Sequence, residues 1–174
     1  MGALLALSLL TACSGSSDDE PTIKPTSDAP STAAAPPDPD GLTPEQREVV
    51  DAVEAYGAAI IGRGNAPIGP VIKDLVTQDV YDFIVPAETE NVEDAGLQYI
   101  GQTTLTPTKV TITGDTATVQ GCDDGSAAFL VKKGETSAGV GSQPVSTTKI
   151  NFGLVREGDR WIISDPESTV VSAC

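Results

Sequence analysis

The spacing of apolar residues changes along the chain, from a helical period in the first half to strand alternation in the second. A first helix is expected to begin after Thr43, which suits the N-cap, with Pro44 at the first helical position and Gln46 completing a capping box. Residues 62–65, Gly-Arg-Gly-Asn, are expected to end this helix. Its apolar residues recur at helical spacing and form one face: Val49, Val53, Tyr56 and Ile60.

Two shorter helices are expected before the strands begin. One starts after Pro70, and its inward face comprises Ile72, Leu75 and Val76. The other covers residues 79–85. Pro86 is expected to stop it, because proline lacks the N–H group that a helix interior requires.

From about Leu97 onward, apolar and polar residues alternate as they do in β-strands. The segments 109–113 and 116–120 flank Gly114-Asp115, which is a hairpin signature. The inward side of this hairpin is expected to comprise Val110, Ile112, Ala117 and Val119. The later elements, in order, are a strand over 127–132, a loop over 134–143, a strand over 148–155, a turn over 156–159 and a strand over 160–164. Helices followed by an antiparallel meander predict an α+β fold rather than βαβ units.

The N-terminal segment has a different pattern. Residues 3–9 are almost entirely apolar, Leu10-Thr11-Ala12-Cys13 follows, and the chain becomes polar directly after Cys13. This arrangement resembles the bacterial lipoprotein signal peptide, in which the cysteine receives a lipid that carries palmitate and becomes the new N-terminus. An apolar stretch this short favours a removable signal over residues 1–12. The resemblance implies that lipid on Cys13 holds the protein at the outer face of the cytoplasmic membrane.

The first three residues depart from the signal-peptide pattern. Met1-Gly2-Ala3 carries no lysine or arginine, whereas signal peptides begin with basic residues. Either translation starts upstream or the signal is atypical. The alternative is a chance apolar N-terminus in a cytosolic protein, but the change of composition at Cys13 itself favours the signal.

Residues 13–41 are expected to form a disordered tether between the lipid and a folded domain. Proline, serine, threonine, alanine and aspartate dominate this segment. Ile23 is its only large apolar residue, so it cannot build a core. The folded domain is therefore expected to span residues 42–174.

The charge and the lack of histidine exclude several classes of function. A chain of 174 residues with a net charge of −15 has no basic stripe that could follow phosphates, so we expect no nucleic-acid partner. Without histidine, the commonest general base, the Ser-His and Cys-His pairs and most zinc sites are ruled out. We therefore predict no catalytic residue, no cofactor and no metal site.

The chain contains three cysteines: Cys13, Cys122 and Cys174. If Cys13 carries lipid, an even pair remains in an oxidising compartment, which favours a disulfide between Cys122 and Cys174. Residues 166–173 have little apolar content and form a tail that would fray unless such a bond tied it down. The alternative is two free buried thiols. A reactive thiol is less favoured, because no basic neighbour lowers its pKa.

Several motifs occur in an order that resembles one known group. Gly114 to Val119 reads Gly-Asp-Thr-Ala-Thr-Val, Cys122-Asp123-Asp124 follows, and Gly-Asp-Arg-Trp at 158–161 precedes the terminal Cys174. This order is similar to that of the small secreted or lipid-anchored NTF2-like (SnoaL-like) proteins of actinobacteria. The resemblance covers residues 43–174. It implies an NTF2-like cone, in which N-terminal helices pack on a curved antiparallel β-sheet.

The same resemblance raises the question of a pocket. NTF2-like folds often hold one inside the cone, and some members are isomerases or dehydratases that place an aspartate with histidine or tyrosine there. This chain offers Tyr56, Tyr81, Tyr99 and a few aspartates but no histidine. We interpret Tyr56 and Trp161 as core residues rather than as ligand-binding ones.

The acidic pair Asp123-Asp124 is interpreted as part of a turn. Asp-Asp-Gly after a strand is typical of turns, and the chain contains no Asp-x-Asp-x-Asp-Gly loop that would indicate calcium.

These features predict a lipid-anchored, extracytoplasmic NTF2-like lipoprotein that acts as a binding or accessory module of the cell envelope. Its partner would be another envelope protein, a wall precursor or a small apolar ligand. Two alternatives stay open: a pocket enzyme of the SnoaL type, and a phage-encoded superinfection-exclusion lipoprotein. A perturbed aspartate deep in an apolar pocket would favour the enzyme, whereas a filled cone with an exposed apolar patch would favour the binding module.

Overall fold

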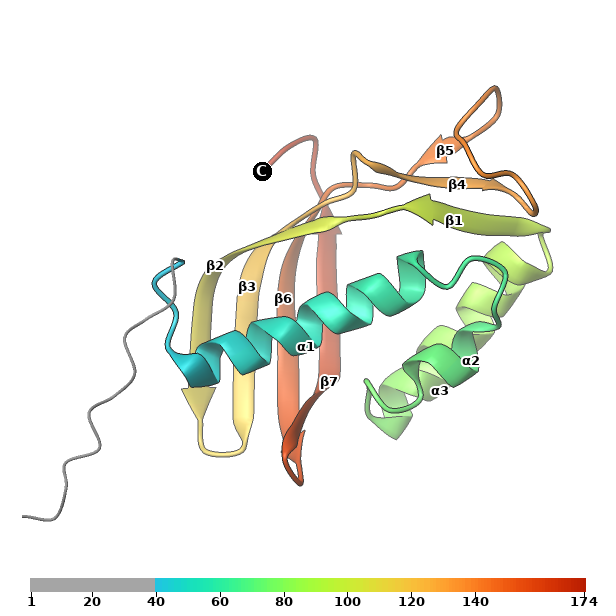
Figure 1. Cartoon of the computed structure of the whole chain (residues 1–174). Coiled ribbons are helices and arrows are strands. Elements are labelled where there is room, and N and C mark those ends of the chain that lie inside the picture. Colours follow the sequence, from blue (N-terminus) through green and yellow to red (C-terminus); the bar gives the residue numbers. More distant parts are fainter. Residues whose placement is uncertain (1–39) are drawn as a thin grey trace, which may run out of the picture. The chain divides into compact units, whose positions relative to one another are not determined.

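The computed structural model describes residues 40–174, which form a group of helices followed by seven strands (Figure 1). The expected signal over 1–12, the lipidation site Cys13 and the expected tether as far as residue 39 lie outside the described residues. Within residues 40–174, no helix is long and apolar enough to cross a membrane.

Helix α1 spans Pro44–Ile61 and has the ends that the sequence predicts. The Thr43 side chain accepts a hydrogen bond from the backbone N–H of Gln46, and the Gln46 side chain accepts one from the backbone N–H of Thr43. These two bonds form the predicted capping box, and Gly62 is the C-cap. On the predicted apolar face, Val49, Val53 and Tyr56 are buried and Ile60 is half-buried. This face packs on the sheet, which α1 crosses (Figure 1).

The second helix begins earlier than expected. α2 spans Ile68–Ile72, so it starts before Pro70 rather than after it. The first N–H groups of a helix have no partner within the helix, so a proline there removes no hydrogen bond. The inward side is largely as predicted, since Ile72 and Val76 are buried and Leu75 is half-buried.

The expectation that Pro86 stops the third helix is wrong. α3 spans Gln78–Glu88, contains Pro86, and passes directly into one turn of π-helix, η1, Thr89–Glu93. The continuation buries Val92 and brings two glutamates to Arg63. These contacts offset the cost of about 3 kcal/mol that a proline adds inside a helix.

The strands form two antiparallel sheets, with the orders β1-β4-β5 and β2-β3-β6-β7. Their bounds are β1 Leu97–Gly101, β2 Thr104–Thr113, β3 Thr116–Asp124, β4 Ala128–Lys132, β5 Gln143–Pro144, β6 Thr148–Glu157 and β7 Arg160–Val170. The predicted hairpin is confirmed as β2–β3, in which Val110 lies opposite Val119 and Ile112 opposite Ala117. The strands expected over 127–132 and 148–155 are present as β4 and β6.

The two sheets are joined at a bend, where the chain passes from a strand of one sheet into a strand of the other in three places. β1 leads into β2, β3 into β4, and β5 into β6, with short breaks between them. Gly101 at this bend has φ +87°, and a Cβ atom there would overlap the carbonyl oxygen of Ala127. At Gly125, a Cβ atom would lie 2.6 Å from the carbonyl oxygen of Ser146. Only glycine fits at these two positions, where another part of the backbone approaches closely. These close approaches allow the bend that gives the sheet its predicted curvature.

Most of the expected tail over 166–173 belongs instead to the last strand, which extends beyond the predicted residues 160–164. β7 continues to Val170 and pairs with β6 as far as Thr148. Pro166 is tolerated because β7 is an edge strand, where a missing N–H group breaks no second ladder. The turn expected over 156–159 is confined to Gly158-Asp159, because β6 extends two residues further than expected, to Glu157.

The hydrophobic core lies between the helices and the four-stranded sheet. Its fully buried members include Val49, Ile72, Val119, Leu154 and Ile163. Trp161 is also buried there, as predicted, and the guanidinium group of Arg156 lies 4.4 Å from the centre of its ring. The helices and the four-stranded sheet are therefore closely packed around this core.

Candidate ligand pocket

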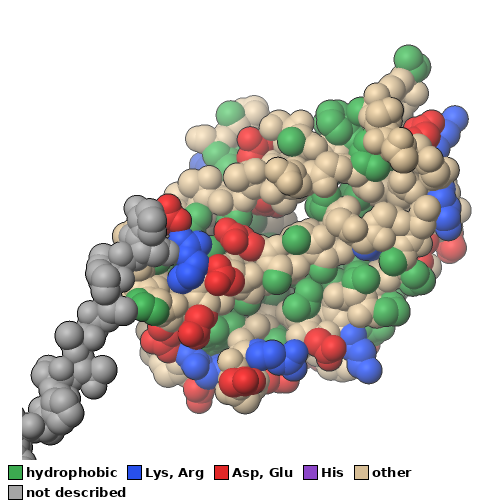
Figure 2. Space-filling view, viewed as in Figure 1, with side chains coloured by type: hydrophobic (Ala, Val, Ile, Leu, Met, Phe, Trp, Pro, Cys, Tyr) green, Lys and Arg blue, Asp and Glu red, His purple; other side chains and the backbone are tan. Residues whose placement is uncertain are grey.

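A pocket of about 680 Å³ lies between the C-terminal half of α1 and the bend of the sheet. The space-filling view shows it as a hollow between α1 and the strand that runs beside it (Figure 2). Its apolar wall includes Val53, Ile60, Ile61, Leu105, Ile150 and Phe152. The cone is therefore open rather than filled between the C-terminal half of α1 and the bend of the sheet.

Gly57 makes room for the pocket on the helix side. It lines the cavity, and a Cβ atom placed on it would meet only the hydroxyl oxygen of Thr103, at 3.8 Å. This distance is an ordinary van der Waals contact. A larger side chain at Gly57 would project into the cavity without a clash at its first atom.

Asp123 also lines this pocket, although the sequence pattern predicts a turn residue at this position. Side chains alternate along β3, and Ala117, Val119 and Gly121 are buried on the face that meets the helices. Asp123 continues that face as a half-buried residue. Interpreting Asp123-Asp124 as a turn stopped the strand too early. Extending the alternation by two positions would have placed this carboxyl group in the cone.

Burial raises the pKa of the Asp123 carboxyl group above its usual value. The hydroxyl group of Thr103 acts in the opposite direction because it donates a hydrogen bond to the carboxylate, and the charge of Asp124 adds a smaller upward effect. The net shift is upward, so the apolar surroundings dominate. Asp123 is thus a carboxyl group whose charge the protein itself compensates poorly.

Two of the three candidate tyrosines meet at the pocket. Tyr56 packs edge-on against Phe152, with ring centres 6.0 Å apart, so it belongs to the core as predicted and also lines the cavity. The Tyr99 hydroxyl donates a hydrogen bond to Glu88, and burial together with this glutamate raises the pKa of Tyr99 to about 12. Burial is also the main cause that raises the pKa of Tyr56. Both hydroxyl groups therefore stay protonated at neutral pH.

Tyr81 lies elsewhere. It is a half-buried residue of α3 and is absent from the pocket wall. Its hydroxyl group lies against Gly69 of α2, so closely that a Cβ atom there would be 2.6 Å away. Tyr81 therefore packs two helices together.

A buried ion cluster lies beside the tyrosines. The Arg63 guanidinium group donates hydrogen bonds of 2.8 Å to both Glu88 and Glu93, and it lies 5.8 Å from the centre of the Tyr99 ring. Glu93 also accepts a hydrogen bond from the backbone N–H of Ile68. The Arg63 side chain is only 2% exposed, whereas the two glutamates are 21% and 26% exposed. The cluster joins the end of α1 to α2, α3 and η1.

Replacing Arg63 with methionine is expected to lower the free energy of unfolding by about 2–3 kcal/mol, because two partly buried carboxylates lose their partner. This expected loss of stability is smaller than the loss for a fully buried ion pair, because both glutamates are still partly exposed to water. Arg160→Met removes the same charge from an exposed site and should change stability little. Urea unfolding of both variants measures the difference. Equal stability of the two variants would contradict a structural role for the cluster.

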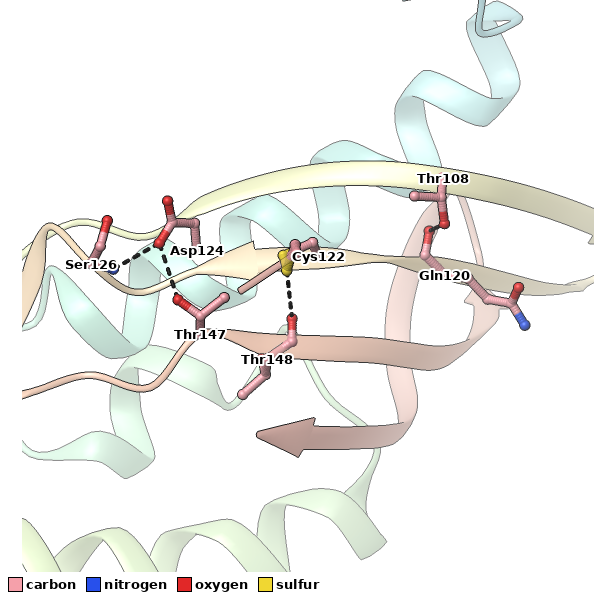
Figure 3. The surroundings of a disulfide bond; sticks show 8 residues. Thr108, Gln120, Cys122, Asp124, Ser126, Thr147 and Thr148 are labelled. Carbon is pink, nitrogen blue, oxygen red and sulfur yellow. Dashed lines mark hydrogen bonds between the residues drawn. A yellow bond between two sulfur atoms is a disulfide. The ribbon is translucent and has the colours of Figure 1, made fainter. Parts of the chain in front are cut away.

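Asp124 and the cysteine pair lie on the other side of β3 (Figure 3). Asp124 accepts hydrogen bonds from the Ser126 backbone and the Thr147 hydroxyl, and the Ser126 bond is the main cause that lowers its pKa. This is the local geometry expected of a turn residue. Cys122 and Cys174 lie at disulfide-bonding distance, with Cα atoms 6.0 Å apart.

Within residues 40–174, no three His, Cys, Asp or Glu side chains gather in a way that could hold a metal ion. The polar residues in the pocket wall include Glu54, Asp123, Thr103, Tyr56 and Tyr99. A few polar residues in an apolar wall are typical of pockets that bind small molecules.

Comparison with other proteins gives similarity at the level of structure. No protein-family model and no curated protein matches the sequence. The intermembrane space region of the chloroplast protein ARC6 is similar at a TM-score of 0.51 and 15% identity, over 72% of this chain and 97% of that one. At this identity, the similarity shows a shared fold alone.

Two bacterial structures described as NTF2-like also resemble the chain. One, from Shewanella oneidensis, has a TM-score of 0.48 and 15% identity over 71% of this chain and 98% of that one. The other, from Novosphingobium aromaticivorans, has a TM-score of 0.47 and 15% identity over 75% and 84%. The predicted α+β architecture, with N-terminal helices packed on a curved antiparallel sheet, is confirmed, and these structures resemble it.

Proposed function

We propose that this protein binds a small, largely apolar molecule in the pocket between α1 and the bend of the sheet. The observation that carries the proposal is the cavity of about 680 Å³, which has an apolar wall and a few polar groups. Ligand sites of proteins typically measure about 300–1,000 Å³ and have this composition. The open pocket supports a small ligand rather than a protein partner docked on a filled cone.

The walls of the pocket are held by rigid parts of the fold, which favours binding without a large rearrangement. α1 is capped at both ends and fixed by the core, and the Arg63 cluster anchors the chain that follows it. On the sheet side, Gly101 and Gly125 set the bend. A preformed cavity lowers the entropic cost of binding.

The proposed site of action is the outer face of the cytoplasmic membrane. Support comes from the sequence: the signal-like residues 1–12, Cys13 for the lipid, and the proline-rich residues 13–41. The protein would then hold its ligand for the cell envelope, or pass it to another envelope protein. This placement does not depend on the chemistry of the pocket.

A second candidate function, acid–base catalysis of the SnoaL type, is favoured by one observation. Asp123 lines the pocket with a raised pKa, which suits a group that takes up and returns a proton. Tyr56 and Tyr99 would serve only as hydrogen-bond donors, since both hold their protons. An isomerase or dehydratase turnover that Asp123→Asn abolishes would establish this candidate, and turnover that survives the change would remove it.

Binding is tested with the uncharged fluorescent probe N-phenylnaphthylamine and the full chain. We expect saturable fluorescence enhancement, and we expect Gly57→Leu to weaken binding about tenfold or more because leucine fills part of the cavity. The matched control is Ala55→Leu, an exposed position two residues away on the same helix, which should leave the affinity unchanged. No saturable binding, or equal binding by the two variants, would contradict the proposal.

A further inference from the structure

The charged side chains that line the pocket are acidic. Two ionisable carboxyl groups line it, Asp123 from β3 and the more exposed Glu54 from α1. Among residues 40–174, no lysine or arginine contributes to its wall. The chain as a whole carries a net charge of −15, which adds a general attraction for cations and repulsion of anions.

Asp123 has no ion-pair partner among residues 40–174, where salt bridges join Arg47, Arg63 and Arg156 to other acids. Its hydrogen-bond donor in the pocket is the neutral hydroxyl group of Thr103. A half-buried carboxylate that lines the pocket and has one neutral donor retains further acceptor positions. An ammonium group can fill such positions and compensate the charge at the same time.

The remainder of the wall suits the apolar body of such a molecule. Leu105 and Ile150 provide aliphatic surface, and Tyr56, Tyr99 and Phe152 provide aromatic rings. Aromatic faces are also favourable surroundings for a cation. The pocket therefore offers one anionic point and an apolar, aromatic surface around it.

From this arrangement we infer that the ligand is a hydrophobic amine, a molecule with one ammonium group bound at Asp123 and an apolar body held against α1 and the sheet. The inference rests on the proposed small-molecule function and specifies its ligand class. It excludes fatty acids and other hydrophobic anions, which would bring a negative charge beside Asp123.

The inference has a pH dependence. An ammonium group favours the ionised form of Asp123, so amine affinity should fall as the pH is lowered through the raised pKa of this group. Glu54 also lines the pocket and would strengthen the attraction when ionised. Asp124 lies outside the pocket wall and has only a small effect on Asp123, and Tyr56 and Tyr99 remain neutral. An uncharged ligand of the same shape should show no such loss.

The experiment compares three probes that share one ring system: naphthylmethylamine, naphthylmethanol and naphthoic acid. Each displaces N-phenylnaphthylamine from the full chain at neutral pH. We expect the amine to bind about tenfold more tightly than the alcohol, and the acid to bind least. Asp123→Asn should remove the advantage of the amine and leave the affinity for the alcohol unchanged, which also shows that the variant is folded.

Asp124→Asn is the matched control, because it removes the same charge from the neighbouring residue on the other side of β3. It should preserve the preference for the amine. An alcohol or acid that binds as tightly as the amine, or an amine preference that survives Asp123→Asn, would overturn the inference while the pocket function stands. If neither N-phenylnaphthylamine nor any of the three probes binds, the proposed function fails, and the inference fails with it.

Discussion

Replacing Cys13 with alanine is expected to move the protein from the membrane fraction to the soluble or secreted fraction. The lipobox-like segment around Cys13 predicts that its thiol carries a lipid, and each buried methylene group of such a chain contributes about 0.8 kcal/mol to membrane binding. Loss of the whole lipid therefore has a larger effect than any change in the folded domain. Cell fractionation followed by immunoblotting measures the partition.

The control for this experiment is Ser14→Ala, which changes the next residue and leaves the thiol in place. This variant should remain in the membrane fraction. If the Cys13→Ala protein stays with the membrane as well, the interpretation of residues 1–12 as a lipoprotein signal is wrong.

Loss of the proposed disulfide is expected to lower the free energy of unfolding by about 4 kcal/mol in the chain-entropy model. Cys122 and Cys174 are separated by 52 residues, so a bond between them would close a long loop in the unfolded chain. Cys122→Ser and Cys174→Ser should have similar effects. The double variant should be no less stable than either single one, because each change already removes the bond. Denaturant unfolding of oxidised protein measures all three.

Reduction by dithiothreitol provides the matching control. It should lower the stability of the wild-type protein to that of the serine variants and leave the variants themselves unaffected. Two free thiols titrated in unfolded, unreduced protein purified from the envelope would rule out the bond.

The elements predicted correctly from sequence are those with local signals. α1 was predicted with its ends because Thr43 and Gln46 form a capping box and Gly62 ends the helix. The β2–β3 hairpin was predicted because Gly114-Asp115 separates two alternating segments. In both cases, residues close in the sequence determine the structure, so no knowledge of distant contacts was needed.

The predictions from sequence are wrong or incomplete where contacts between residues far apart in the sequence determine the structure. α3 continues through Pro86 because its extension reaches Arg63, thirty residues from Glu93 in the sequence. β7 continues to Val170 because β6 pairs with it along its length. Asp123 was missed for the same reason, since only the length of β3 beyond Gly121 shows that this carboxyl group faces the cone. The pocket depends on the bend between the sheets, which no local pattern marked.

The position of α1 has a mechanical consequence. Any pull on the domain from residues that precede it first meets the ion pair between Asp40 and Arg47 and then the start of this helix at Thr43. There the load meets a hydrogen bond from Gln46 to the carbonyl oxygen of Val110 and an ion pair between Glu45 and Arg156. The pocket wall begins at Val53, about 15 Å further along the helix axis. Tension would thus be transferred to the sheet before it reached the cavity.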